Sequence, residues 1–185
     1  MRHRPLSGMV GLVLLSAIAP IAVVAEEAGR DALAPGAASG HYHVSGETVD
    51  TATGARRAIS GSITVHHRGD AYSASFELRT ALPGAHVPPV EAQVVGNGTG
   101  KVTGRTLRGK ADTQMLTGLP GSDPRSVSAP RRLSARIHSR SVAEIAPDGS
   151  ISIEIENEPA PGDAYQPTRT VLKGERMRPA PDASR

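Results

Sequence analysis

Residues 40–78, GHYHVSGETVDTATGARRAISGSITVHHRGDAYSASFEL, decide the predicted fold. Three segments of this stretch carry apolar or small residues at every second position: Tyr42 and Val44; Ile59, Gly61, Ile63 and Val65; and Tyr72, Ala74, Phe76 and Leu78. A period of two places alternate side chains on opposite faces of a strand, so each segment has one face for a core and one for water. Arg68-Gly69-Asp70-Ala71, between the last two segments, is typical of a tight hairpin turn. The stretch therefore predicts an antiparallel β-meander with one apolar side.

The rest of the chain continues in short segments of the same kind. Further strands are expected near residues 91–95, 101–107, 109–117, 133–145, 151–156 and 168–177. The clearest alternation puts Ile151, Ile153 and Ile155 on one face, directly after the turn sequence Pro147-Asp148-Gly149. Short strands spaced by roughly 8–12 residues are typical of sandwiches and barrels. We expect an all-β fold: a single antiparallel meander of about eight strands that closes into a small barrel or sandwich.

The first 25 residues predict an export signal. Arg2 and Arg4 give a basic start, residues 9–24 are apolar and uncharged, and Val23-Val24-Ala25 ends the run with small side chains that suit cleavage. An uncleaved membrane anchor is the alternative, because the run approaches the ~20 residues that span a bilayer. The predicted organisation is a signal peptide (1–25), a flexible lead-in (26–39), an all-β domain (40–177) and a disordered tail (178–185). A secreted or periplasmic protein that meets the membrane only during export follows from it.

Composition excludes several classes of function. The chain has no cysteine, which excludes disulfides, thiol nucleophiles and cysteine-ligated metals. Its formal net charge is +3, and two of the 21 basic residues lie in the leader, so 19 basic residues face 18 acidic ones beyond it. These charges are scattered and there are only four aromatic residues, so a nucleic-acid surface is not predicted. Four aromatics also cannot supply the two girdles of an outer-membrane barrel.

The histidines suggest a metal site. His41 and His43 stand two apart, so in a strand both point to the face opposite Tyr42. If Tyr42 pairs with Val65, then His41 faces His66, and a shift by two residues puts His43 opposite His66 instead. Either register would gather His41, His43 and His66 on one outer patch, a workable geometry for zinc or copper. The alternative is a solvated strand with ordinary surface histidines and no cofactor.

The apolar face of the meander suggests a ligand site. A barrel of about eight strands can hold one small molecule. Tyr42, Ile63, Tyr72 and Phe76 are the side chains expected to line such a cavity. The alternative is that these side chains fill the core, because the chain has few other large ones.

Three other motifs have structural explanations. Arg68-Gly69-Asp70 spells a tripeptide recognised by integrins, but glycine and aspartate are also what a tight turn requires. Residues 96–101 (GNGTGK) resemble a phosphate loop, yet Val95 and Val102 replace the required glycine and hydroxyl residue and no helix is expected to follow, so a turn is predicted at 96–100. Glu154 and Glu156 share a strand face, and their alternation with isoleucines indicates a wet face rather than a catalytic pair.

Catalysis is not predicted. No serine stands in a Gly-x-Ser-x-Gly sequence, and no other catalytic constellation is visible. The opening Gly40-x-Tyr42-x-Val44, the meander and the leader resemble uncharacterised secreted bacterial proteins with lipocalin-like barrels. The resemblance covers about the first half of the chain beyond the leader. The chain lacks the tryptophan of true lipocalins. The resemblance therefore implies a barrel but no activity and no site residue.

The sequence thus predicts an exported, non-catalytic binding or interaction protein. Its partner would be a small apolar ligand in the meander interior, or a protein held by the loops at 79–89 and 118–132. The alternatives are an exported metal-binding protein using the surface histidines, and an envelope structural or adhesion protein.

Overall fold

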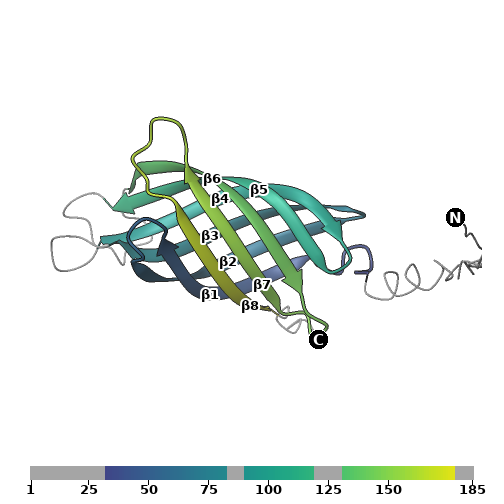
Figure 1. Cartoon of the computed structure of the whole chain (residues 1–185). Helices are drawn as coiled ribbons and strands as arrows, with labels where there is room; N and C mark the ends of the chain where they lie inside the picture. The colour runs from purple at the N-terminus through teal and green to yellow at the C-terminus, as the bar shows by residue number, and fades with distance from the viewer. Residues whose placement is uncertain (1–31, 83–89, 119–130, 178–185) are drawn as a thin grey trace, which may run out of the picture.

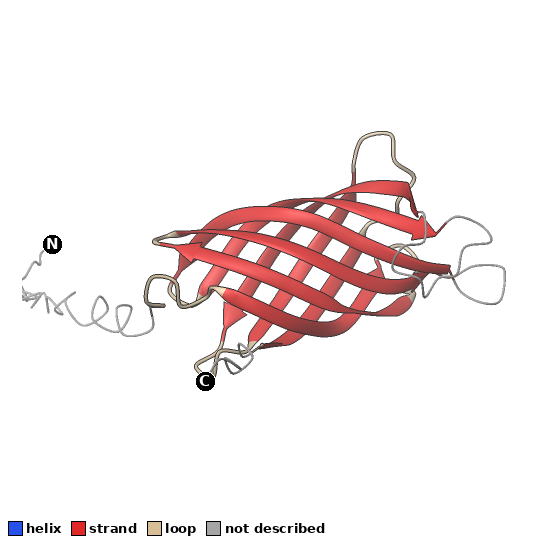
Figure 2. Ribbon diagram, turned by 180° about the vertical axis from the view of Figure 1, so that it is seen from behind, coloured by secondary structure: helices blue, strands red, loops and turns tan. Residues whose placement is uncertain are grey.

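The protein is a closed eight-stranded β-barrel (Figures 1 and 2). The computed structural model describes residues 32–82, 90–118 and 131–177. The strands are β1 (Gly40–Asp50), β2 (Arg56–Arg68), β3 (Ala71–Leu82), β4 (Val90–Thr103), β5 (Thr106–Gly118), β6 (Arg131–Ile145), β7 (Ile151–Pro159) and β8 (Thr168–Arg176). Each strand pairs antiparallel with its sequence neighbours, and β1 pairs with β8 to close the ring. The prediction of an all-β meander is confirmed, and the form it takes is a barrel.

The barrel has two different ends. The hairpins β2–β3, β4–β5 and β6–β7 lie at one end, together with residues 32–39, and we call this end the floor (right in Figure 1). The connections β1–β2 and β7–β8 lie at the opposite end, which we call the mouth, with the strand ends that flank residues 83–89 and 119–130. The predicted hairpin at Gly69 is confirmed: Arg68 pairs with Ala71, and Gly69 has a φ of 61°. Much of both predicted interaction loops lies outside the described residues.

Side chains alternate between an apolar interior and a polar exterior. On β7, Ile151 and Ile153 are buried while Ser152, Glu154 and Glu156 point to water. Glu154 forms an ion pair with Arg169 of β8 at 2.7 Å, with both side chains more than half exposed. The expectation that these glutamates form a wet strand face is confirmed. The same alternation in the other strands builds two apolar clusters, the larger of which joins residues from both ends of the chain.

The predicted flanking segments are described only in part. The leader (1–25) and the tail (178–185) lie outside the described residues. The lead-in was expected to be flexible, but its described part, residues 32–39, packs onto the floor through Ala38, which is fully buried. Leu33 donates its N–H to the Gly104 carbonyl at 3.2 Å, which fixes the segment to the β4–β5 hairpin. Across the described residues, no helix has the length and apolar character needed to cross a membrane.

The glycine-rich run of β4 corrects a prediction. Residues 96–100 were expected to form a turn, but they lie in the middle of β4. The chain turns instead at Gly104, whose φ of 59° is the left-handed conformation that a tight hairpin requires. A run of glycines favours a turn when only local preference acts. Here the glycines stay in the strand because the rings of Tyr72 and Phe76 pack against them.

The register of β1 against β2 is also different from both predicted alternatives. Tyr42 pairs with Ile63, and His41 pairs with Thr64. The β1–β2 turn sets this register: the Asp50 carboxylate accepts the backbone N–H groups of Ala52 and Thr53 at 2.9 and 2.8 Å, and Gly54 has a φ of 72°. Because this turn closes between Asp50 and Ala55, His66 extends beyond the pairing with β1.

The predicted face of Leu133 in β6 is wrong because a β-bulge changes the register there. Leu133 was expected to share a face with Ala135 and Ile137. The pairing with β5 shifts between Met115 and Leu116, which leaves Ser134 as an extra residue in β6. A single extra residue turns the preceding side chain to the other face, and Leu133 is 45% exposed as a result.

Candidate functional site

The barrel interior contains a cavity of about 100 Å³. All eight strands contribute to its wall, and most of the side chains in the wall are aliphatic or aromatic, among them Ile59, Ile63, Val65, Tyr72, Phe76, Leu78, Leu107, Met115, Ile137, Ile151, Ile153 and Ile155. Inward-facing positions of consecutive strands supply these residues because side chains alternate along each strand. The cavity reaches from Arg57 near the mouth to Val65 near the floor.

Two aromatic rings lie against the cavity wall because the neighbouring strands carry glycine. Phe76 of β3 pairs with Gly96, and a Cβ at Gly96 would stand 2.5 Å from its Cζ atom. Tyr72 pairs with Gly100, where a Cβ would stand 2.6 Å from its Cε1 atom. The glycines thus receive the two rings at the wall, and this arrangement leaves space in the middle of the barrel.

A chain of hydrogen bonds, which we call the polar belt, crosses five strands inside the barrel near the mouth. Its members are Thr113 (β5), Ser139 (β6), Asn157 (β7), Thr170 (β8) and Thr48 (β1). Ser139 donates to Asn157 Oδ1 at 2.7 Å, and its own oxygen lies 3.1 Å from the Thr113 hydroxyl. Asn157 Nδ2 donates to Thr170 at 3.3 Å, and Thr170 donates to Thr48 at 3.0 Å. The belt satisfies its own hydrogen bonds, so its burial has little cost.

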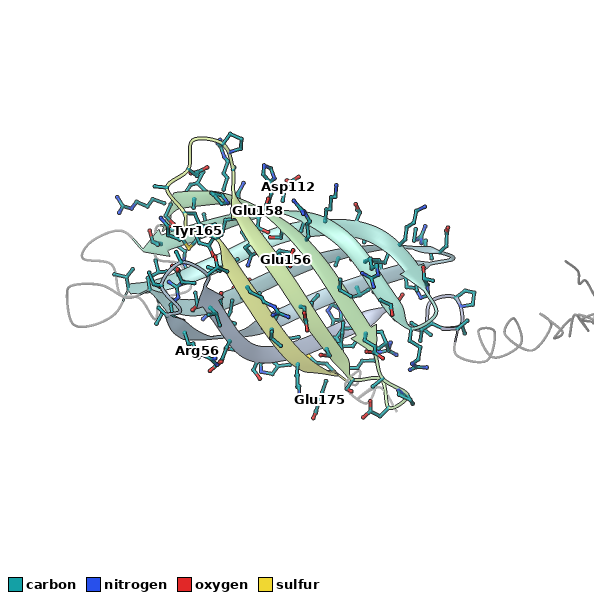
Figure 3. All side chains as sticks on the ribbon, in the orientation of Figure 1. Arg56, Asp112, Glu156, Glu158, Tyr165 and Glu175 are labelled. Atoms are coloured by element: carbon teal, nitrogen blue, oxygen red, sulfur yellow. The ribbon has the colours of Figure 1, made fainter. Side chains whose placement is uncertain are left out.

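Arg57 and Tyr165 complete the cavity at the mouth. Arg57 stands beside Thr48 in the β1–β2 register, on the inward-facing positions of β2, and its Nε atom is buried without a hydrogen-bond partner. Tyr165, in the β7–β8 connection, places its hydroxyl 2.9 Å from the Thr168 hydroxyl (Figure 3). Burial raises the pKa of the Tyr165 hydroxyl, and the bond to Thr168 and the nearby Arg57 charge oppose that rise. Tyr165 therefore remains a neutral hydrogen-bonding group at physiological pH.

The floor of the barrel is closed by Tyr42. Its side chain is fully buried, and its hydroxyl donates to the Ala38 carbonyl at 2.9 Å. Arg176 of β8 donates to the same hydroxyl at 3.0 Å, and its guanidinium carbon lies 5.6 Å from the ring centroid. Arg176 also donates to the Ala37 carbonyl. These contacts tie both ends of the described chain together beneath the core.

His67 supports the floor from β2. It is buried, and its Nε2 atom lies 2.8 Å from the Gly69 carbonyl while its Nδ1 atom lies 3.4 Å from the Ala38 N–H. The Ala38 N–H needs an acceptor at Nδ1, so the arrangement fits a neutral imidazole with its proton on Nε2. His67 is thus a structural residue that connects the β2–β3 hairpin to residues 32–39.

The four predicted ligand-site residues are divided between the cavity and the floor. Ile63, Tyr72 and Phe76 line the cavity. Tyr42 shares their face of the meander, but it is held in the floor by Ala38 and Arg176. Alternation does not predict this arrangement, because residues 32–39 lack any periodic pattern.

The three predicted metal-site histidines lie on the outer surface. His41 Nδ1 lies 2.8 Å from the Thr64 hydroxyl, His43 pairs with Ser62 and with Glu175 of β8, and His66 pairs with Ser73. In the described part of the chain, no three histidine, aspartate or glutamate side chains are grouped so that they could hold a metal ion.

Sequence reasoning missed the polar groups of the interior. Arg57 falls on the same inward-facing positions as Ile59 and Ile63, and Asn157 continues the series of Ile151, Ile153 and Ile155. A polar residue on an otherwise apolar strand face is the signal that marks both. No protein-family model matches the sequence, and neither the curated proteins nor the solved structures contain a match to the chain.

Proposed function

We propose that this protein is a non-catalytic binding protein that holds one small, mainly apolar ligand inside its barrel. The cavity of about 100 Å³ carries this proposal, because an apolar chamber left open in a packed barrel provides a binding site. Complete side-chain packing would be expected if the interior served stability alone. Because residues 1–25 are predicted to direct export, the protein would meet its ligand in the periplasm or after secretion.

The dimensions of the cavity favour a slender ligand. An apolar cavity of about 150 Å³ in another protein binds benzene, and the smaller volume here disfavours a ring of that width. Here the wall extends along β2 from Arg57 to Val65, eight residues, which is roughly 20 Å along the barrel axis for a tilted strand. A linear aliphatic chain fits a long and narrow space better than a broad ring system does.

The chemistry of the polar belt supports binding rather than catalysis. Its hydroxyl and amide groups are bonded to one another, so Ser139 has Thr113 and Asn157 as partners and no base to activate it. The buried histidine, His67, is in the floor and is bonded to backbone groups. These groups can orient a ligand without reacting with it.

The test uses 1-decanol, an uncharged molecule with a linear chain, and isothermal titration calorimetry on the chain from residue 26. We expect saturable binding with one site. Ala111 lines the cavity and Ala58 points to water, so Ala111→Leu fills the site and Ala58→Leu is the matched control. Each displaced methylene group is worth about 0.8 kcal/mol, so Ala111→Leu is expected to weaken binding at least about tenfold. No binding of 1-decanol, or equal binding by both variants, would contradict the proposal.

A further inference from the structure

We propose that the natural ligand is an amphiphile with a single negative charge, whose carboxylate binds Arg57 at the mouth while its aliphatic chain occupies the cavity. The inference rests on the proposed function and specifies the ligand class of the same site. Its starting point is a cation facing the interior of a barrel that is otherwise apolar or neutral.

Arg57 and Arg56 occupy adjacent positions of β2 on opposite faces. Arg56 points to water and forms an ion pair with Glu47 at 3.1 Å (Figure 3). Arg57 is half-buried and lines the cavity, and its Nε atom lacks a hydrogen-bond partner. Among the described residues, no carboxylate lies within ion-pair distance of Arg57. Arg56, which points outward, thus has an ion-pair partner, whereas Arg57, which points inward, has an N–H donor without an acceptor.

The carboxylate whose pKa the Arg57 charge affects, that of Asp50, is already hydrogen-bonded. Asp50, at the end of β1, accepts the N–H groups of Ala52 and Thr53. The Thr53 N–H is the main cause of the lowered pKa of Asp50, and the Arg57 charge is only a minor cause. A half-buried guanidinium without a partner is costly, and an anionic ligand would remove that cost.

The surrounding groups favour a carboxylate over a more highly charged head. Arg57 is the only cation in the wall of the cavity described here, and its neighbours Thr48 and Tyr165 are neutral. Two further buried atoms near the mouth lack a hydrogen-bond partner: the Thr117 hydroxyl of β5, and Glu91 Oε1 of β4, which lies 3.9 Å from the Arg79 guanidinium. A planar guanidinium matches a carboxylate with two parallel hydrogen bonds, and one cation balances one negative charge.

The test compares three probes that have the same chain: decanoate, 1-decanol and decylamine, titrated by calorimetry at neutral pH into the chain from residue 26. We expect decanoate to bind most tightly and decylamine most weakly. Hydrogen bonds to a charged group predict that Arg57→Gln weakens decanoate binding about 10- to 100-fold. The same variant should weaken 1-decanol binding much less than decanoate binding, because 1-decanol carries no charge to pair with the guanidinium.

Arg56→Gln is the matched control. It removes the same charge from the adjacent residue on the outer face, and it should leave decanoate affinity unchanged. Circular dichroism and the melting temperature establish that each variant folds, and Arg57→Lys, which keeps the charge, should restore part of the affinity. Equal loss of affinity in Arg56→Gln and Arg57→Gln would overturn the inference.

The outcomes separate the inference from the proposed function. If 1-decanol binds as tightly as decanoate and Arg57→Gln changes neither affinity, the charged-head inference is overturned and the apolar cavity site stands. If none of the three probes binds the folded protein, both are overturned. Selective loss of decanoate binding in Arg57→Gln supports both.

Discussion

Tyr72 lies against Gly100 on the neighbouring strand, so closely that a Cβ at Gly100 would stand 2.6 Å from the tyrosine ring. The same Cβ would stand closer still to the Arg108 carbonyl oxygen of β5, so Gly100→Ala forces both the ring and the β4–β5 backbone to shift. Overpacking of this kind costs about 1–3 kcal/mol of unfolding free energy. Urea unfolding followed by circular dichroism measures the loss. Gly118→Ala is the control, because no atom lies within 4 Å of its Cβ position. Equal stability of the two variants would show that the ring does not depend on Gly100.

Asn157 connects the two halves of the polar belt. Asn157→Leu removes the acceptor of Ser139 and the donor to Thr168 and Thr170, so several buried hydroxyls lose a partner. We expect a loss of about 1–3 kcal/mol in unfolding free energy, measured by urea unfolding. Asn97→Leu, on the exposed face of β4, is the matched control. A loss no larger than that of the control would mean that the belt does not contribute to stability.

Tyr42 closes the floor through its hydroxyl group. Tyr42→Phe keeps the ring but removes the bond to Ala38 and the acceptor for Arg176, and the expected loss is about 1 kcal/mol. Backbone hydrogen exchange should become faster at residues 37–39, which that contact holds. Unchanged exchange rates in that segment would contradict a closing role for the hydroxyl. Because Tyr42 does not line the cavity, affinity for 1-decanol should remain within about twofold.

Two turn aspartates predict a loss of stability in acid. The Thr53 N–H lowers the pKa of Asp50, and the Ser150 N–H lowers the pKa of Asp148, each below the ordinary value of 3.8. A group with a lowered pKa in the folded state stabilises the fold above its ordinary pKa, and that contribution disappears as the pH falls through the folded value. The melting temperature of Asp50→Asn/Asp148→Asn should therefore decline less steeply below pH 3.8 than that of the parent chain.

The matched control for this pH dependence is Glu156→Gln, which removes a carboxylate from the exposed face of β7. Its melting temperature should follow the parent curve in acid more closely than the double variant does. Parallel curves for the parent and the double variant would show that the turn aspartates do not contribute.

The sequence was sufficient to predict the class of fold because one signal dominates it. Alternation of apolar and polar residues marked the faces of β2, β3 and β7 correctly, and Gly69 marked a hairpin. Local preference alone predicts a turn at the glycines of β4. Contact with Tyr72 and Phe76, which is not local, decides otherwise.

The candidate site was predicted only in part for similar reasons. Ile63, Tyr72 and Phe76 follow from the strand pattern alone. Tyr42 obeys the same pattern, yet a segment without periodicity, residues 32–39, covers it. The position of the three histidines depended on a register that the Asp50 turn sets, and alternation does not reveal turn geometry.

The pairing of β1 with β8 limits when the barrel can close during folding. Thr48 bonds to Thr170, which is 122 residues later in the chain. A nascent or truncated polypeptide that ends before β8 would leave β1 and β7 with open edges, and open edges recruit other chains. The ring can therefore close only once residues 168–176 are available to pair with β1, and a chain that crosses a membrane before it folds would reach the far side with that pairing still to form.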